Sequence, residues 1–306
     1  MNPTVSPCAA AAAVLRCGRH AVDLGQTRVM GIVNVTPDSF SDGGRFRDAA
    51  AAIAFARKLR DDGAAIIDVG GESTRPGAAP VTEADELARV LPVVEALAGD
   101  GAVVSVDTMK PGVMRAAIAA GASMINDVRA LQDDGALAAV ASGGVAVCLM
   151  HMQGEPRSMQ AAPGYDDVVA EVAAFLRERA RACEDAGIAP DRIAVDPGFG
   201  FGKSVAHNLA LLRELRTLAG LGYPVVAGLS RKSTLGALTG RPPGERLAAS
   251  VAAALTAAAN GAAIVRVHDV RETVDALCVW SAAQASQPPR ESSLSRPPTL
   301  TVQSHP

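Results

Sequence analysis

Val29-Met-Gly-Ile-Val-Asn-Val35 is a short, almost wholly apolar run in which the one polar side chain, Asn34, comes near the end. Such a run is typical of a strand that is buried on both faces, as in a parallel sheet. No G-x-G-x-x-G pattern follows it, which argues against an open, doubly wound dinucleotide-binding sheet. The run therefore predicts a buried parallel strand in a fold of another kind.

Seven similar runs follow along the chain. They are Ala65–Val69, Val103–Val106, Met124–Asn126, Val145–Met150, Ile193–Val195, Val225–Ala227 and Ala263–Val267. Between them, apolar residues recur at helical spacings of three and four, as in Leu87, Val90, Leu91, Val94 and Leu97. Alternating strands and helices indicate βαβ units. Eight such units within 306 residues predict a single (β/α)8 TIM-type barrel, of α/β class.

The two ends of the chain differ from this repeating part. Residues 1–16 are expected to form a flexible N-terminus, and the segment from Cys17 to Leu24 a small hairpin that plugs the barrel bottom. Residues 286–306 are rich in Pro and Ser and poor in apolar side chains, so they predict a disordered C-terminal tail. The barrel domain is therefore expected to span residues 17–285.

The composition limits the class of partner. A net charge of -3 and a pI near 6.0 leave no broad basic surface for nucleic acid or an anionic membrane. No run of 18 strongly apolar residues is long enough to cross a bilayer. The five cysteines are scattered and form no C-x-x-C pair, which favours reduced thiols in the cytoplasm. These features predict a cytoplasmic protein that binds small molecules.

Polar side chains stand at or just after the ends of most predicted strands. They are Asn34, Asp107, Asn126, Asp196, Lys232, Arg266 and His268. One interpretation is helix capping, by Asp107 or Thr108 near Pro111 and by Asn126 or Asp127 before the next helix. In a TIM barrel, however, catalytic groups gather where strands end and loops begin. Because these residues bring both charges to one rim, we favour a binding site.

Three loops add to this signal. Residues 34–44 and 70–77 form long, polar, glycine-containing connections, whereas βα loops usually have about 2–6 residues. Long loops on a rigid barrel commonly bind ligands or close over them. The third loop, Asp196-Pro-Gly-Phe-Gly-Phe-Gly-Lys203, places two phenylalanines in a backbone that can approach a ligand closely. A flat aromatic ligand would explain this loop.

Eight motifs in these positions resemble those of the dihydropteroate synthases, a family of pterin-binding barrels. They are NVTPDSFSDGG (34–44), DVGGESTRPGA (68–78), SVDT (105–108), INDV (125–128), CLMHMQG (148–154), DPGFGFGK (196–203), LSRKS (229–233) and RVHD (266–269). The resemblance runs from about Gly18 to Ala283. A single motif of this kind is weak, but eight in order at expected strand ends are specific.

The resemblance implies a transferase that condenses 6-hydroxymethyl-7,8-dihydropterin diphosphate with para-aminobenzoate. The products would be 7,8-dihydropteroate, for folate biosynthesis, and diphosphate. The family pattern implies a dissociative substitution assisted by Mg²⁺ on the diphosphate. It also implies a homodimer, and inhibition by sulfonamides, which copy the shape of para-aminobenzoate.

The same resemblance assigns roles to residues. The pterin would contact Asp107, Asn126, Met150, Asp196, Phe201 and Lys232, with Phe199 beside them. The diphosphate would contact Asn34, Arg266 and His268, with Mg²⁺ bound at Asn34. Para-aminobenzoate would lie among Phe40, Thr74, Arg75, Pro76 and Ser233. The residues expected to act in catalysis are Lys232, Asp107, Asp196, Arg266 and His268. Carboxylates and an Asn oxygen suit the N–H groups of a pterin, while Lys232 suits its carbonyl.

Two alternatives share parts of this pattern. A methyltetrahydrofolate-dependent corrinoid methyltransferase would account for Asp107, Asn126 and Asp196, but would need neither S-T-R-P-G after the second strand nor R-x-H on the eighth. A non-catalytic pterin-binding relative predicts decay in those same segments, and the sequence shows none. The synthase is therefore the favoured hypothesis.

Overall fold

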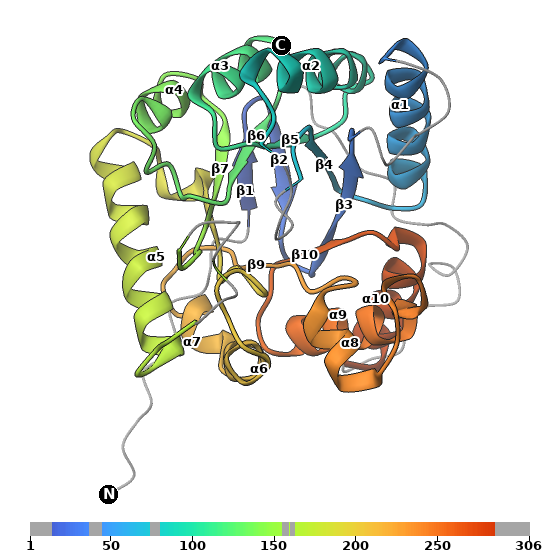
Figure 1. Cartoon of the computed structure of the whole chain (residues 1–306), viewed down its shortest axis with the longest axis vertical. Helices are drawn as coiled ribbons and strands as arrows, with labels where there is room; N and C mark the ends of the chain where they lie inside the picture. Colours follow the sequence, from blue (N-terminus) through green and yellow to red (C-terminus); the bar gives the residue numbers. More distant parts are fainter. Residues whose placement is uncertain (1–13, 37–44, 74–79, 155–158, 160–162, 285–306) are drawn as a thin grey trace, which may run out of the picture.

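The computed structural model describes residues 14–36, 45–73, 80–154, 159 and 163–284, and shows a barrel of parallel strands ringed by helices (Figure 1). The strands are β3 (Arg28–Asn34), β4 (Ile66–Gly70), β5 (Val104–Asp107), β6 (Met124–Asp127), β7 (Ala146–Met150), β8 (Ile193–Asp196), β9 (Val226–Ala227) and β10 (Ile264–Val267). Their order is β8-β7-β6-β5-β4-β3-β10-β9, and a bridge from Val195 to Val225 joins the two edges. The predicted (β/α)8 barrel is therefore confirmed.

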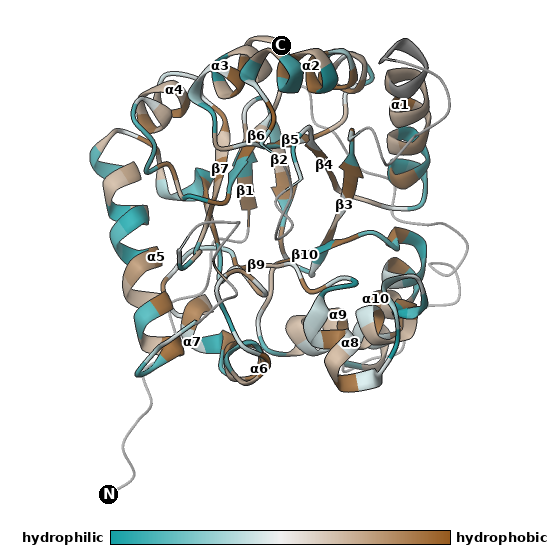
Figure 2. Cartoon of the chain, in the orientation of Figure 1, coloured by the Kyte–Doolittle hydropathy of each residue, from teal (hydrophilic) through white to brown (hydrophobic). Residues whose placement is uncertain are grey.

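Helices pack outside the strands and present polar residues to solvent (Figure 2). They are α1 (Arg45–Asp61), α2 (Glu83–Gly99), α3 (Pro111–Ala119), α4 (Ala136–Ala141), α5 (Val168–Asp185), α6 (Val205–Arg213), α7 (Leu215–Ala219), α8 (Ser233–Thr239), α9 (Leu247–Ala259) and α10 (Val270–Gln284), with the short 3-10 helices η1 (Pro190–Arg192) and η2 (Pro243–Glu245). In α2, Val90, Val94 and Leu97 are fully buried, as their spacing predicts. This apolar packing between strands and helices forms the larger of two cores.

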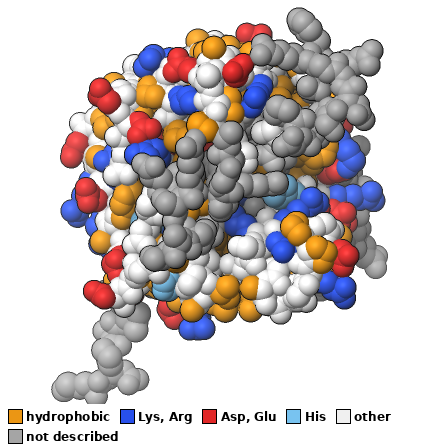
Figure 3. Space-filling model, in the orientation of Figure 1, with side chains coloured by type: hydrophobic (Ala, Val, Ile, Leu, Met, Phe, Trp, Pro, Cys, Tyr) orange, Lys and Arg blue, Asp and Glu red, His pale blue; other side chains and the backbone are white. Residues whose placement is uncertain are grey.

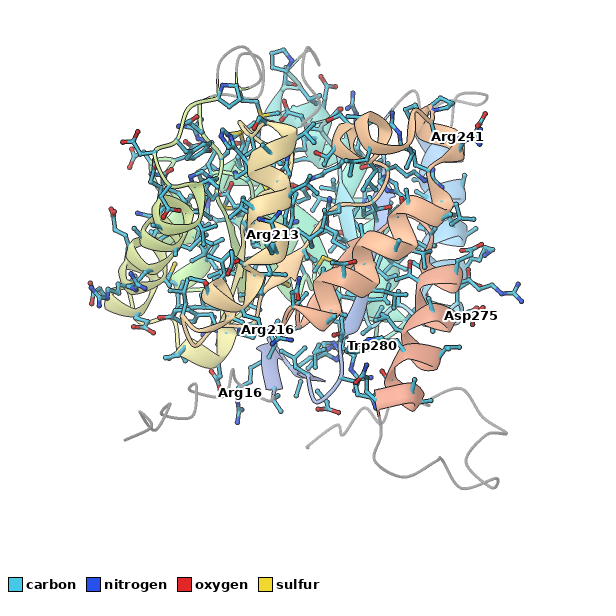
Figure 4. All side chains as sticks on the ribbon, turned by 90° about the horizontal axis from the view of Figure 1, so that it is seen from below. Arg16, Arg213, Arg216, Arg241, Asp275 and Trp280 are labelled. Carbon is cyan, nitrogen blue, oxygen red and sulfur yellow. The ribbon has the colours of Figure 1, made fainter. Side chains whose placement is uncertain are left out.

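The N-terminal hairpin closes one end of the barrel. Strands β1 (Val14–Cys17) and β2 (His20–Asp23) pair antiparallel around Gly18, whose φ of +60° favours glycine. The hairpin was expected from Cys17 onward, but its first strand begins at Val14, so residues 14–16 are not part of a flexible segment. Figure 4 shows the hairpin, marked by Arg16, at the lower end of the molecule.

Side chains that point into the barrel form two layers, because alternate residues of a strand face the same side. The lower layer is apolar and packs against the hairpin; it includes Leu15, Met30, Ile66, Met124, Ala194, Val226 and Ile264. Two positions further along four of these strands the residue is polar or charged: Asp68, Asn126, Asp196 and Arg266. The strand period thus places a charged layer directly above an apolar one.

Residues 1–13, 37–44, 74–79, 155–158, 160–162 and 285–306 lie outside the described residues, and with them the expected C-terminal tail. Within the described part of the chain, no helix combines the length and apolarity that a bilayer crossing requires.

We expect Leu15→Ala to lower the free energy of unfolding by about 2–5 kcal/mol, because it removes a fully buried side chain from the lower core. Binding of a pterin, which the resemblance predicts at the opposite end of the barrel, should be unchanged. Chemical denaturation and calorimetric titration of a pterin would measure the two effects. Val14→Ala, at a position 40% exposed on the same strand, is the control and should cost less than about 0.5 kcal/mol. Weakened binding by Leu15→Ala with unchanged stability would contradict this division between the layers.

Candidate active site

The charged layer is centred on Arg266, which points inward from β10. Its Nε lies 2.6 Å from Oδ2 of Asp68 on β4, and its Nη2 lies 2.8 Å from Oδ2 of Asp107 on β5. The Nδ2 group of Asn126 on β6 donates to the same Asp68 oxygen at 3.3 Å. One guanidinium and one carboxylate therefore connect four strands at the C-terminal end of the barrel.

Burial decides the charge state of this cluster. The Asp68 side chain is fully buried, and those of Asp107 and Arg266 are only 14% and 19% exposed. Burial raises the pKa of Asp107 to about 7, and the attraction of Arg266 offsets only part of that rise. Burial also acts against the charge of Arg266, but Asp68 and Asp107 outweigh it and hold the pKa of Arg266 above its usual range. Arg266 is thus a permanent cation, and Asp107 changes its protonation near neutral pH.

Asp196 and Lys232 form the opposite side of the site. Burial raises the pKa of Asp196, against the attraction of Lys232, and burial lowers the pKa of Lys232 to about 8. Lys232 donates to the carbonyl of Phe199, and its Nζ lies 4.5 Å from the centroid of the Phe201 ring. A Cβ on Gly228 would lie 3.9 Å from Asp196 Oδ2 and 4.0 Å from Lys232 Nζ. The missing side chain of Gly228 leaves space beside both charged groups.

The loop of residues 196–203 folds back over the end of β7. The N–H group of Gly198 donates to Asp196 Oδ1 at 2.7 Å, which orients that carboxylate. Met150 at the end of β7 is 5% exposed and Phe201 is half-buried, so both remain suited to contact a ligand. Phe199 is 1% exposed and packs in the main core. Of the two loop phenylalanines, Phe201 is therefore the more accessible, and the position of Phe199 beside the ligand stays a prediction.

Further polar groups surround this centre, on the face seen in Figure 3, where Lys, Arg and His side chains show near the middle of the molecule. Nδ1 of His268 lies 3.0 Å from the hydroxyl of Ser230. At the end of β3, Asn34 Oδ1 lies 3.8 Å from the position of a Cβ on Gly70, and the Asp107 Cβ lies 3.6 Å from the same point. Asn34 therefore stands next to Asp107 on the rim.

The structure separates capping residues from site residues. Helix α3 begins after Lys110 without a side-chain cap, and Asp107 instead binds Arg266, so the capping interpretation of Asp107 is wrong. Thr108 Oγ1 does accept the N–H of Lys110 at 3.2 Å. Asp127 accepts the N–H groups of Arg129 and Leu131, each at 2.8 Å. Thr108 and Asp127 therefore shape turns, while their neighbours point into the barrel.

Of the residues expected around para-aminobenzoate, the structure describes Ser233 alone. It is the first residue of α8 and is exposed, directly after Lys232. Phe40, Thr74, Arg75 and Pro76 lie outside the described residues.

Sequence reasoning assigned no role to Asp68, although this residue anchors both Arg266 and Asn126. A signal was present, because Asp68 is a lone charge inside the apolar run Ala65–Val69, two positions after the inward-facing Ile66. Sequence reasoning also missed the buried contact between Lys203 and His151, whose side-chain nitrogens lie 2.9 Å apart.

Comparisons with known proteins show the family of this chain. A model of the family described as pterin binding enzyme matches residues 30–268. The dihydropteroate synthase of Escherichia coli strain K12 is 52% identical over 268 residues, which cover 87% of this chain and 95% of the relative. Among solved structures, the Xanthomonas albilineans dihydropteroate synthase with 4-aminobenzoic acid is 57% identical with a TM-score of 0.85, covering 90% of this chain and 99% of that one. The Yersinia pestis dihydropteroate synthase with a sulfonamide drug is 50% identical with a TM-score of 0.84, covering 89% and 99%. The family match begins within β3 and reaches into the last of the eight motifs, and together with the relatives it shows that the chain belongs to the dihydropteroate synthases, transferases of the pterin binding enzyme family.

Proposed function

We propose that the charged layer of the barrel binds 6-hydroxymethyl-7,8-dihydropterin diphosphate and joins it to para-aminobenzoate, giving 7,8-dihydropteroate and diphosphate. The observation that carries this proposal is the set of inward-facing groups at one end of the barrel, in which Arg266 binds Asp68 and Asp107 while Asp196 faces Lys232. This arrangement offers fixed acceptors and donors to a flat, polar, heterocyclic ligand.

The pterin ring lies between the two halves of the site. Its amino and ring N–H groups donate to Asp196, Asp107 and the side-chain oxygen of Asn126, and its carbonyl accepts from Lys232. Phe201, whose ring already lies beside the Lys232 ammonium, packs on the pterin face, with Met150 next to it. Asp68 touches no reactant in this arrangement and holds Arg266 and Asn126 in place.

The diphosphate lies at the rim, near Arg266, His268 and Asn34. Two bonds to carboxylates fix the plane of the Arg266 guanidinium, so its remaining N–H groups point in a set direction. Ser230 likewise orients His268. The C–O bond to the diphosphate breaks and its electron pair leaves with the diphosphate, while the pterin methylene gains cationic character. The amine nitrogen of para-aminobenzoate then forms the C–N bond and releases a proton, and no protein nucleophile is required.

Mg²⁺ fits this rim as a partner of the diphosphate. In the described part of the chain, no three His, Cys, Asp or Glu side chains are arranged to hold a metal ion. Mg²⁺ is commonly held by one or two protein oxygens, with water and phosphate oxygens completing its shell. The carboxamide oxygen of Asn34, at the end of β3, suits that role. When bound, Mg²⁺ neutralises charge on the departing diphosphate.

Para-aminobenzoate binds next to this rim, between Ser233 and the loops of residues 34–44 and 70–78. Phe40, Thr74, Arg75 and Pro76 line its pocket in this proposal, which rests on the sequence motifs. Sulfonamides bind in the same pocket and inhibit the enzyme.

The proposal extends to the compartment and the oligomeric state of the enzyme. The four cysteines that the structure describes are all free, which supports a reducing, cytoplasmic compartment. The family resemblance supports a homodimer. Exposed Leu238, Leu247 and Val279 on the neighbouring helices α8, α9 and α10 provide apolar surface for such an interface.

The proposed reaction requires that diphosphate release depends on both para-aminobenzoate and Mg²⁺. We expect release from pterin diphosphate to fall to near background when either is left out. A coupled assay of diphosphate, with chelator and Mg²⁺ re-addition, measures this. Methyl transfer from methyltetrahydrofolate to a corrinoid, without diphosphate release, would overturn the proposal.

The pocket for para-aminobenzoate should form only after the pterin diphosphate, or pterin with diphosphate and Mg²⁺, has bound. Two glycine-containing loops supply most of this pocket and lose conformational entropy in forming it. By linkage, para-aminobenzoate should in turn tighten retention of diphosphate. Calorimetric titrations of para-aminobenzoate into the free and the saturated protein compare the two affinities. Equal affinities would refute the loop-ordered pocket but leave the reaction standing.

The pH dependence of stability should report on Asp107. Its pKa is 3.8 in the absence of burial and about 7 in the folded chain. A pKa raised by folding contributes stability that is present below the unfolded value and is lost as the pH rises through the folded value. Asp107→Asn, which cannot ionise, should therefore gain in unfolding free energy relative to the parent protein from about pH 4 to about pH 7. Chemical denaturation across this range tests the trend, with the exposed Asp134→Asn as control. A stability difference that stays flat for Asp107→Asn would show that Asp107 remains ionised throughout.

A further inference from the structure

Lys203 ends the glycine-rich loop of residues 196–203 and is 3% exposed. Its Nζ lies 2.9 Å from Nδ1 of His151, 3.3 Å from the His151 carbonyl oxygen and 3.0 Å from the Phe201 carbonyl oxygen. A lysine ammonium has three N–H donors and no acceptor. The three neighbouring acceptors therefore match the three donors of the protonated side chain.

We propose that Lys203 is a positioning residue for pterin binding, because it ties the loop of residues 196–203 to the segment that follows β7. The tie holds Phe201 through its carbonyl group, next to Phe199, whose carbonyl accepts from Lys232. Lys203 itself contacts no reactant in the proposed site. This inference rests on the proposed assignment of that loop to the pterin.

The loop lies directly against the segment of residues 151–153. A Cβ on Gly198 would stand 1.9 Å from the His151 carbonyl oxygen, and a Cβ on Gly202 would stand 2.4 Å from that of Gln153. Both glycines have positive φ, at +66° and +63°, so no other residue fits here without strain. Such close backbone contact leaves the loop little freedom to shift while Lys203 holds it.

Two neutral side chains complete the attachment of the loop. Asn208 Oδ1 accepts the N–H of Gly200 at 2.8 Å, and the Tyr165 hydroxyl donates to the Gly202 carbonyl at 2.9 Å. Hydrogen bonds from a charged donor are stronger than neutral ones, especially when buried. Lys203, when protonated, is therefore a stronger tie than Asn208 or Tyr165, and Lys232, which donates to the Phe199 carbonyl, is the other cation that holds the loop.

The partner of Lys203 is suited to accept a hydrogen bond. Burial and the positive charge of Lys203 lower the pKa of His151 to about 3, so its ring is neutral at physiological pH. With the ring proton on Nε2, Nδ1 carries the lone pair that accepts from Lys203. The ring packs edge-on against Phe175, with centroids 4.9 Å apart, and this contact fixes its orientation. Burial and the charge of Lys232 lower the pKa of Lys203 to about 7, although Asp196 acts in the opposite direction.

A contact at the other end of the same two strands provides a matched control. Arg192 donates through Nε and Nη2 to the Val145 carbonyl, at 3.0 and 2.6 Å, next to the starts of β8 and β7. Like Lys203, it is a cation that joins these neighbouring segments through a carbonyl. Arg192 lies at the N-terminal ends of the strands, so Arg192→Met should lower stability without reaching the site.

The test is calorimetric titration of the full chain with two probes, a pterin that lacks diphosphate and diphosphate with Mg²⁺. We expect Lys203→Met to weaken pterin binding about tenfold or more, from the loss of buried charge-assisted hydrogen bonds. Diphosphate binding by Lys203→Met, and both bindings by Arg192→Met, should stay within about twofold of the parent protein. Equal losses for the two probes, or equal losses in the two variants, would reduce Lys203 to a general stabilising role and overturn the proposal.

A second pair of variants covers the outcome in which Lys203→Met does not fold. Asn at position 151 can place its Oδ1 where His151 has Nδ1, whereas Leu offers no acceptor. His151→Asn should therefore retain the affinity for the pterin, whereas His151→Leu should weaken it, as Lys203→Met does. Equal pterin binding by these two variants would contradict the proposed contact.

Asp196→Asn separates failure of this inference from failure of the site assignment. If Asp196→Asn weakens pterin binding and Lys203→Met does not, the positioning role of Lys203 alone is wrong. If Asp196→Asn binds the pterin as the parent protein does, the pterin site itself is misplaced, and the inference falls with it.

Discussion

The ion pair that Arg266 makes with Asp68 and Asp107 is the constraint on which the site depends. Burying these charges costs free energy that is recovered only with good geometry, and removing one partner of a buried pair typically costs about 3–5 kcal/mol. Because the partners come from β4, β5 and β10, they can meet only if β10 pairs with β3, β3 with β4 and β4 with β5 in the observed register. The cluster therefore depends on that register, and Asn126 is placed through Asp68 in the same way.

The apolar layer below offsets part of the free energy that burying the charged layer costs. Leu15 and Cys17 of the hairpin close the barrel bottom against inward-facing side chains such as Met30 and Ile66, all of them fully buried. This end of the barrel buries apolar side chains and carries no reactive group. The charged layer therefore borders an apolar region of low dielectric on one side and the ligand on the other. That surrounding explains why the pKa of Asp107 rises while that of Lys232 falls, since burial opposes whichever form carries charge.

The sequence predicted the strands to within one residue, because strands buried on both faces form continuous apolar runs. It also placed Asp107, Asn126, Asp196 and Arg266 together, since parallel strands end on one rim. The sequence did not predict which of these side chains contact one another. Asp68 and Arg266 are 198 positions apart, and their contact depends on the pairing of β10 and β4 with β3 in the observed register. The sequence also did not predict that Phe199 is more deeply buried than Phe201, because alternate residues of an irregular glycine-rich loop need not face the same side.

The balance of charge in the site accounts for the kind of ligand that it accepts. Three inward-facing carboxylates, of Asp68, Asp107 and Asp196, stand against two cations, Arg266 and Lys232, and Asp68 and Asp107 already bind Arg266. A diphosphate placed here therefore needs additional positive charge, which is why Mg²⁺ belongs to the proposed rim. A pterin instead needs negatively charged acceptors, because its N–H groups donate best to ionised carboxylates. Such hydrogen bonds lower the pKa values of Asp107 and Asp196 and so act against burial, which raises them. Pterin binding and ionisation of these carboxylates should therefore favour one another, and the layer that is costly in the empty barrel is stabilised by its ligand.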